Sequence, residues 1–314
     1  MPYRDQSFAT GDTVVTDTQN MLASSSENIA AIVERAASNI VTVHGAGRWS
    51  ASGIHWRSGV IVTAEERLER DENIALTLPG GHQVEASLAG RDPTTDVAVL
   101  RFQPDGLPIA AITDAPARAG QLVLAVGARD GAALAALGIV AFAGGAWRSA
   151  RGGTIDSLIR LDLSLSPAAE GGALVEAQGR VIAMTVLGPR RRALAIPVST
   201  INRAVDQLLA KGHVVRGYLG AGLQALPRES RSTPPGTSAQ GLIVVSIDPD
   251  GPSARAGLLV GDIITTWNGD RIERVRDVMR RLGPESAGNA TDLTVTRGGA
   301  PKAIKVVIGE RPVT

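Results

Sequence analysis

The chain has 314 residues, of which 44% are hydrophobic and 20% charged, and its formal net charge at pH 7 is +1. This length predicts two or three globular domains, and the near-neutral charge gives no electrostatic footprint for nucleic acid. There is no cysteine, which excludes disulfide bonds, thiolate catalysis and cysteine-ligated zinc.

The N-terminal region divides into a polar arm and an amphipathic helix. Residues 1–23 are rich in Thr, Asp and Ser, which predicts a flexible arm. Ser24 and Glu27 are spaced as a capping box, a pairing that begins helices. The apolar residues that follow at helical spacing are Ile29, Ile32, Val33 and Ala36. We therefore predict a short helix from Ser24 that leads into a strand at Ile40.

Short runs of β-forming residues follow up to about residue 196, separated by Gly, Pro, Asp and Asn. The runs are Val60–Thr63, Ile74–Leu78, Gln83–Leu88, Val97–Phe102, Gln121–Val126, Leu137–Phe142, Ile159–Leu165, Val181–Val186 and Leu194–Ile196. Many short strands with turn signals between them are typical of a β-sandwich or a β-barrel. The spacing alone leaves both architectures open.

The segment Ile159–Val175 predicts a strand, a tight turn and a second strand. Leucines alternate with polar residues over 161–166, which is the period of a half-buried strand. Pro167 has no N–H to donate to a sheet and ends this strand. The two glycines at 171–172 then allow a sharp turn before the apolar run resumes.

A helix and a linker separate this β region from the C-terminal hundred residues. Pro197 stands at the first position of a predicted helix that ends at Gly212. We place the linker at 212–216. Further on, residues 228–240 are rich in Ser, Thr and Pro, which predicts an irregular insertion.

The loop Ser166–Leu174 has the sequence Ser-Pro-Ala-Ala-Glu-Gly-Gly-Ala-Leu. It resembles the nucleophile loop of the HtrA (DegP) family of chymotrypsin-like proteases, Asn-Pro-Gly-Asn-Ser-Gly-Gly-Pro-Leu, with Glu170 at the position of the serine. Ala168 stands where the family has a glycine beside the oxyanion hole. If the Glu170 carboxylate turns inward, we expect it to lie near the amides of that hole and compete with a developing oxyanion.

The other two triad positions follow from the same resemblance. The segment Asp92–Leu100 is similar to the family's sequence around its catalytic aspartate, and this places Asp96 at that position. The segment Val62–Leu68 is similar to the family's sequence around its histidine, and this places Glu66 there. The resemblance therefore implies a degenerate triad of Glu66, Asp96 and Glu170, in which the acid remains while the base and the nucleophile are replaced.

The C-terminal region resembles the PDZ domains of the same family. The similar segments are Arg216–Gly220, Gly241–Val245, Gly251–Leu258, Val260–Ile264 and Asp292–Arg297. The resemblance implies a mainly β protein. We expect a chymotrypsin-like double β-barrel over 24–211, made of two six-stranded barrels, followed by a small α+β PDZ domain over 212–314.

A peptide-binding groove is implied for the PDZ domain. By resemblance its residues are Arg216, Tyr218, Leu219, Gly220, Ala221, Val275 and Met279. Such domains add a peptide as an extra strand and hold its C-terminal carboxylate with backbone N–H groups. We expect protein or peptide C-termini as partners, unless the 228–240 insertion covers the groove.

We interpret the chain as a catalytically inactive HtrA-like pseudoprotease that acts as a scaffold, chaperone or adaptor. None of its four histidines, at 44, 55, 82 and 213, falls at the triad position. One alternative is an active serine endopeptidase with unconventional residues, or a proton-sharing carboxyl pair that activates water. Another is a cation-binding protein that uses the Glu66/Asp96/Glu170 cluster. We favour neutralisation of this cluster by Arg67 and expect no metal or cofactor.

Partners and compartment follow less directly from the residues. The resemblance implies a homotrimer, whereas nucleic acid is not expected. No apolar run approaches the roughly 20 residues of a membrane span. The first 26 residues lack a basic segment followed by an apolar one, so the sequence as it stands predicts a cytoplasmic protein. A sequence that begins after its export signal would instead predict a periplasmic one.

Overall fold

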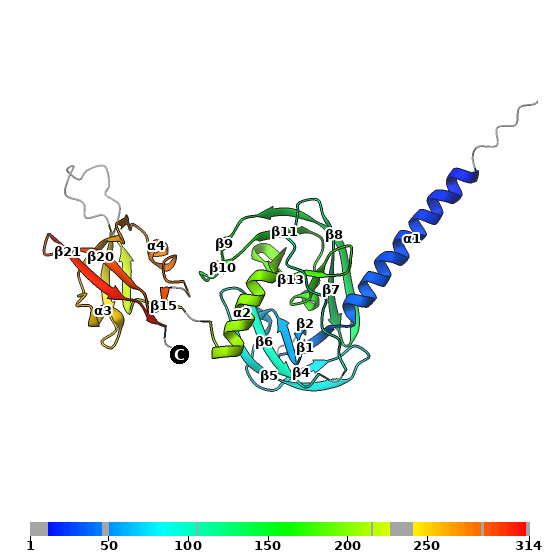
Figure 1. Cartoon of the computed structure of the whole chain (residues 1–314), viewed down its shortest axis with the longest axis horizontal. Helices are drawn as coiled ribbons and strands as arrows, with labels where there is room; N and C mark the ends of the chain where they lie inside the picture. Colours follow the sequence, from blue (N-terminus) through cyan, green and yellow to red (C-terminus); the bar gives the residue numbers. More distant parts are fainter. Residues whose placement is uncertain are drawn as a thin grey trace, which may run out of the picture. The chain divides into compact units, whose positions relative to one another are not determined.

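The computed structural model describes residues 12–45, 50–104, 106–214, 216–226, 241–283 and 286–311. The chain forms two compact units (Figure 1). The first comprises Met1–Trp147 and Ile155–Leu209, and the second comprises Arg148–Thr154 and Ala210–Thr314. Residues 1–11 of the expected arm and the expected insertion at 228–240 lie outside the described residues.

The first six strands close into an antiparallel barrel in the order β1-β2-β3-β6-β5-β4. They are β1 (Ile40–His44), β2 (Ala51–Arg57), β3 (Val60–Thr63), β4 (Ile74–Thr77), β5 (Gln83–Asp92) and β6 (Val97–Phe102). Aliphatic side chains such as Val41, Ile61 and Leu100 fill its interior. Because β3 pairs with β6, the turns that follow β3 and precede β6 come together at one end of this barrel.

A second antiparallel barrel closes in the order β11-β14-β13-β12-β7-β8. Its strands are β7 (Leu122–Arg129), β8 (Ala132–Gly144), β11 (Leu158–Asp162), β12 (Ala173–Val175), β13 (Val181–Gly188) and β14 (Arg192–Pro197). A short hairpin of β9 (Trp147–Arg148) and β10 (Thr154–Ile155) lies between β8 and β11. The prediction of two six-stranded barrels is therefore confirmed.

The strand expected over 159–165 is shorter than its alternating pattern suggested. Strand β11 ends at Asp162, where its pairing with β8 stops at the Asp162–Ile139 pair. The following turn is the 3₁₀ helix η2 (Pro167–Ala169), and Gly171, at φ 81°, returns the chain to β12. Alternation marked the faces of the strand correctly but could not show where its sheet partner ended.

Two helices flank the barrels. Helix α1 spans Asp12–Ala37, so the helix start predicted at Ser24 is wrong, and residues 12–23 of the expected arm are helical. Ser25 lies inside this helix and its hydroxyl donates to the carbonyl of Met21, the local bonding by which serine is tolerated within helices. Helix α2 (Val198–Lys211) follows Pro197 and buries apolar residues that include Ile201 and Val205. In the ranges that the structure describes, no helix is long and apolar enough to span a membrane.

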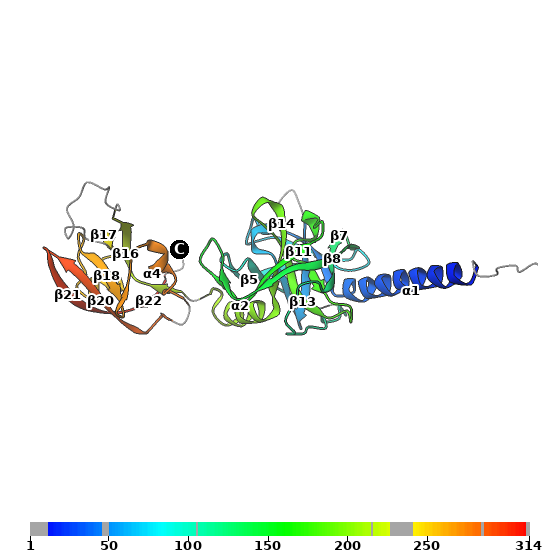
Figure 2. The same ribbon diagram turned by 90° about the horizontal axis from the view of Figure 1, so that it is seen from above.

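The second unit is built on the antiparallel sheet β16-β17-β18-β20-β21, with β19 paired to β18. Its elements are β15 (Gly217–Tyr218), β16 (Ala221–Ala225), β17 (Leu242–Ile247), α3 (Pro252–Arg255), β18 (Ile263–Trp267), β19 (Asp270–Arg271), α4 (Val275–Met279), β20 (Ala290–Arg297), β21 (Ala300–Val307) and β22 (Gly309–Glu310). Figure 2 shows α4 beside β16, the first strand of the sheet. Val278 of α4 packs into the core with Leu242, Ile264 and Val306.

Candidate functional site

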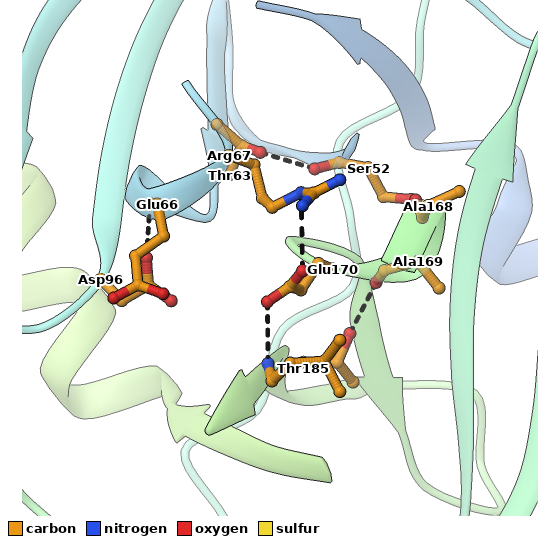
Figure 3. Close-up of polar contacts among 10 residues, drawn as sticks. Ser52, Thr63, Glu66, Arg67, Asp96, Ala168, Ala169, Glu170 and Thr185 are labelled. Atoms are coloured by element: carbon orange, nitrogen blue, oxygen red, sulfur yellow. Dashed lines mark hydrogen bonds and ion pairs between the residues drawn. The ribbon is translucent and has the colours of Figure 1, made fainter. Parts of the chain in front are cut away.

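Three turns carry the residues expected at the triad positions (Figure 3). Glu66 lies in the 3₁₀ helix η1 (Glu65–Arg67), directly after β3. Asp96 occupies the turn between β5 and β6, and Glu170 follows η2 in the second barrel. The electrostatic influence of Glu66 and Glu170 reaches Asp96, so the fold gathers the three carboxylates at one place.

The turn before Asp96 is organised by a neighbouring carboxylate. Asp92 is buried and accepts hydrogen bonds from the N–H and hydroxyl of Thr94 and from the hydroxyl of Thr95. Bonds of this kind stabilise tight turns. The chain leaves the turn through Asp96 itself, whose φ of 58° is one that aspartate tolerates better than most residues.

Asp96 is engaged with the backbone of the opposite turn. Its Oδ1 accepts the backbone N–H of Glu66 at 2.8 Å, and its carbonyl accepts the N–H of Glu65 at 3.4 Å. In a working triad the acid orients a histidine ring through a side-chain hydrogen bond. Here Glu66 stands at the position of that histidine. Its side chain is exposed, and its negative charge repels that of Asp96.

The environment of Asp96 favours its protonated form. The pKa of Asp96 is raised from 3.8 to about 7, mainly by desolvation. The negative charges of Glu66, Glu170 and Glu65 also raise it, and the hydrogen bond from the Glu66 amide lowers it. Like charges in a semi-enclosed site commonly produce this result. The remnant acid therefore carries a proton for much of the time near neutral pH.

This shift predicts a pH-dependent gain in stability for Asp96→Asn. Between pH 3.8 and 7 the unfolded chain ionises Asp96 while the folded chain keeps it protonated, so wild-type stability falls as pH rises across that window. Asparagine carries no charge, tolerates positive φ and can still accept the Glu66 amide. We expect the variant to be more stable than wild type by about 2 kcal/mol at pH 8, after discounting for partial exposure, and equally stable at pH 4.

Urea denaturation at the two pH values measures this difference. Asp114→Asn is a matched control because Asp114 is exposed on the same unit. We expect its free energy of unfolding to differ from that of the wild type by the same amount at both pH values. A variant at position 96 that gains nothing at pH 8 would contradict the assignment of a raised pKa.

The side chain of Glu170 is buried and held by two partners. Its Oε1 accepts the backbone N–H of Leu187 at 3.0 Å, and its Oε2 lies 3.5 Å from Nε of Arg67. Burial raises the pKa of Glu170, while the Leu187 amide and the positive charges of Arg67 and Arg191 oppose the rise. The carboxylate is thus directed at the end of β13. The condition for competition at the oxyanion amides is therefore not met, because the Leu187 amide and Arg67 hold the carboxylate elsewhere.

Backbone amides of the remnant loop are engaged within the loop. The N–H of Ala169 donates to the carbonyl of Ser166 at 2.9 Å, and the N–H of Glu170 donates to the carbonyl of Pro167 at 3.3 Å. An oxyanion hole needs donors that point at the reacting carbonyl. The amide at the nucleophile position instead closes the 3₁₀ turn.

Ser52 ties this loop to both barrels. Its hydroxyl donates to the carbonyl of Ala168 at 2.7 Å and accepts the N–H of Ala128 at 2.9 Å, while its own N–H donates to the carbonyl of Glu170 at 2.8 Å. Sequence reasoning missed this role. A fully buried serine among the apolar residues of β2 was the available signal, since buried hydroxyls are normally hydrogen-bonded.

Glu65, the neighbour of Glu66, has a structural role that no sequence pattern indicated. Glu65 is buried and lies 3.5 Å from Nη1 of Arg91, whose Nη2 donates to the carbonyl of Leu68. This ion pair anchors η1 against the first barrel. The periodicity of such a short turn could not show which of two consecutive glutamates faces inward.

Three of the four histidines bond to groups other than serine hydroxyls. Nδ1 of His55 lies 2.9 Å from the carbonyl of Pro108, Nε2 of His44 lies 2.8 Å from Oγ1 of Thr77, and His213 contacts Glu310. His82 lies between β4 and β5. Across the described ranges no group of three or more His, Asp or Glu side chains is arranged to hold a metal ion.

The residues expected to form the peptide groove lie along β16 and α4. Gly220, at φ 73°, bends the chain into β16, which pairs with β17 and with no other strand of the described ranges. Val275 and Met279 are 38% and 46% exposed one helical turn apart, and Val278 between them faces the core. Leu219 is buried, and its carbonyl accepts both the N–H and the hydroxyl of Ser253. It thereby anchors the turn to α3.

Tyr218 and Arg216 lie at the start of the same turn. The Tyr218 hydroxyl donates to Asp248 at 3.0 Å, and this hydrogen bond raises the pKa of Tyr218. The carbonyl of Arg216 accepts the N–H of Arg311. Within the described residues the structure thus gives a defined turn, a strand at the edge of the sheet and an exposed apolar helix face, and the ligand roles of the individual residues stay predictions.

Both units of the chain are similar to known protein families. A family model described as trypsin-like peptidase domain matches residues 51–184, and a PDZ domain model matches residues 217–308. A probable periplasmic serine endoprotease DegP-like from Brucella suis is 31% identical over 264 residues, 81% of this chain. The structure of the HtrA-type protease AlgW with a decapeptide matches with a TM-score of 0.70 at 25% identity, covering 91% of this chain and 99% of that one.

The chain belongs to the HtrA family. The serine endoprotease DegS of Haemophilus influenzae is 28% identical over 82% of this chain and 76% of its own length. The serine endoprotease from Yersinia pestis matches with a TM-score of 0.69 at 28% identity. This HtrA chain spans about half the length of the DegP-like relatives, 51% for the Brucella suis protein.

Proposed function

We propose that this HtrA-family chain does not hydrolyse peptide bonds and that it binds protein or peptide C-termini through its PDZ domain, as a scaffold, chaperone or adaptor. The observation that carries the proposal is the state of Glu170. A carboxylate held by Leu187 and Arg67 stands where the family has its attacking hydroxyl, and the position of the general base is an exposed glutamate.

The size of the catalytic deficit supports this proposal. In a serine protease studied by mutation, loss of the nucleophile or of the base alone reduces turnover by about 10⁶. The activity that remains there depends on substrate binding and the oxyanion hole. In this chain the Glu170 amide already donates to Pro167, so that residual route is weakened as well.

Two assays test the absence of catalysis. We expect unfolded casein to remain intact with this chain, and a fluorophosphonate probe to leave every serine unlabelled, because His44, His55 and His213 bond to Thr77, Pro108 and Glu310. A related HtrA protease assayed in parallel shows that both reactions work. Cleavage of casein that disappears in Asp96→Ala would refute the proposal and favour a peptidase with unconventional residues.

The PDZ unit supports the binding half of the proposal. β-Strand addition needs an open sheet edge, and β16 offers one beside the exposed apolar face of α4. The relative named AlgW has been solved with a decapeptide and with a tripeptide, and we extend peptide binding to this chain by that likeness. An apolar C-terminal side chain suits Val275 and Met279.

A labelled peptide library with free C-termini tests this half. We expect the best ligands to end in an apolar residue, and we expect amidation of their C-terminus to weaken binding at least tenfold, because the carboxylate is the group that the turn holds. Met279→Asp should weaken binding by a similar factor. Val307→Asp is the matched control, since Val307 is also exposed, at 58%, on β21 at the far side of the sheet. Equal affinity for free and amidated peptides would exclude C-terminus recognition.

We also propose a periplasmic location, in place of the cytoplasmic one expected from the first residues, because the DegP-like relatives are named as periplasmic. Fractionation of the native cells measures it. The homotrimer implied by the family resemblance stays a prediction, which sedimentation of the full chain measures.

A further inference from the structure

The hairpin between β13 and β14 has an unusual tip. Pro189, Arg190 and Arg191 connect the strands, and the carbonyl of Pro189 accepts the N–H of Arg192. Arg190 lies at φ 58°, ψ 30° and Arg191 at φ 56°. Two consecutive residues with positive φ define a type I′ turn, the turn that suits the twist of a hairpin.

Arginine is not a preferred residue at either central position of a type I′ turn. Type I′ turns strongly favour Asn-Gly, because these residues adopt positive φ with little strain. Arginine has a Cβ and a long side chain and gains nothing from the left-handed conformation. Strain of this kind, at a site where ordinary turn residues would serve, points to a role beyond folding.

Among the described residues, no side-chain hydrogen bond or close ion pair offsets the strain, and Arg191 acts on Glu170 only through its charge. Arg190, Arg191 and Arg192 are exposed, and within the described part of the chain none of them forms a hydrogen bond or an ion pair through its side chain. Other arginines of this unit are paired, for example Arg57 with Asp206 and Arg203 with Asp156. The hairpin tip therefore presents three adjacent positive charges to solvent.

The hairpin tip also lies beside Glu170, at the position of the family's nucleophile. Leu187, just before the hairpin, donates its N–H to Glu170, and the charge of Arg191 is felt by the Glu170 carboxyl. The negative charge of Glu66 acts on the same carboxyl. A positive hairpin thus borders a negatively charged turn region, so a ligand that uses the arginines must be short in its charged part.

We propose that the Arg190–Arg192 hairpin docks an acidic segment of a partner polypeptide. Arginine side chains bind carboxylates through paired N–H groups, and three in a row match a short run of Asp or Glu residues. A long polyanion such as nucleic acid fits less well, because the net charge is only +1 and carboxylates lie next to the hairpin. This surface is separate from the PDZ groove and does not depend on whether the barrels can cleave.

A charged peptide with a blocked C-terminus tests the proposal. The probe is a fluorescent octapeptide of alternating Glu and Ser, amidated so that the PDZ turn cannot hold a carboxylate, and its binding to the full chain is followed by anisotropy. We expect saturable binding that weakens with added salt. A peptide with Gln in place of Glu should not bind.

One double variant separates the role of the arginines from that of the fold. Arg190→Asn with Arg191→Gly installs the preferred turn residues, so we expect an unchanged or higher melting temperature and at least tenfold weaker binding of the acidic probe. Arg101→Gln with Arg118→Gln removes the same charge from exposed positions elsewhere on this unit and should leave binding unchanged.

Four results would overturn the proposal. They are no binding by the wild-type chain, equal binding by the Asn-Gly variant, an equal loss in the Arg101/Arg118 variant, and displacement of the probe by a single-stranded oligonucleotide that binds more tightly. Failure of the C-terminal peptide assay, by contrast, would leave this surface unaffected, because the probe has no free carboxylate terminus.

Discussion

Replacement of Gly171 by alanine is expected to lower the free energy of unfolding of the double barrel by about 4 kcal/mol. Gly171 adopts φ 81°, which strains any residue with a Cβ. The added Cβ would also lie 2.3 Å from the carbonyl oxygen of Ser52, 2.7 Å from Oγ1 of Thr63 and 2.8 Å from the amide nitrogen of Ala64. Two of these atoms belong to the backbone of the first barrel, so the loop cannot relax without moving that barrel.

Urea denaturation of the full chain, followed on the barrel transition, measures this effect. Gly120→Ala is the matched control, because Gly120 has a similar φ of 83° but no atom within 4 Å of an added Cβ. We expect the control to cost about 1 kcal/mol from backbone strain alone. Equal losses in the two variants would show that the close approach of the two barrels at Gly171 does not exist in solution.

Removal of the Glu170 side chain is expected to cost about 3 kcal/mol. Glu170→Ala leaves the N–H of Leu187 without its acceptor and leaves Arg67 without its carboxylate. Nε and Nη2 of Arg67 are buried and lack any hydrogen bond in the described ranges, so that ion pair is the main compensation for their burial. Glu170→Gln, which retains an acceptor oxygen for Leu187, should cost about half as much.

A double-mutant cycle with Arg67→Ala tests this account. We expect the double variant Arg67→Ala/Glu170→Ala to be about as stable as Glu170→Ala alone, because the charge left unpaired by the first change is removed by the second. Additive losses would contradict a coupled pair. Glu170→Ser removes the same carboxylate, so a restored serine at this position is expected to destabilise the site.

Parts of the fold followed from local patterns and parts did not. The runs Val60–Thr63 and Val97–Phe102 are strands with those same bounds, because each is a mostly buried run of β-forming residues between turns. Helix α1 begins twelve residues before Ser24, so the capping-box spacing there does not mark the start of the helix. Local propensity set the type of element, and contacts far along the chain set its ends.

In the candidate site, too, some features follow from the local sequence and others only from contacts between distant residues. A motif resemblance assigned Glu66, Asp96 and Glu170 to triad positions, and the turns that carry them do converge. The bonds that decide their chemistry join residues that are far apart in sequence, such as the hydroxyl of Ser52 with the carbonyl of Ala168. Only closure of both barrels produces such contacts. The pairing of Arg67 with a carboxylate was expected, but its partner Glu170 could be named only from the structure.

The sheet of the PDZ unit ends in two strands that differ in how they meet other molecules. Strand β21 carries Pro301 and two of the chain's three lysines, Lys302 and Lys305, all exposed. Proline and lysine on an outermost strand discourage uncontrolled association between copies. Strand β16 has the sequence Ala-Gly-Leu-Gln-Ala, which contains neither proline nor lysine. Association between copies through β21 is thereby disfavoured, whereas no residue of β16 opposes the addition of a strand, so the two edges of the sheet differ in their tendency to pair.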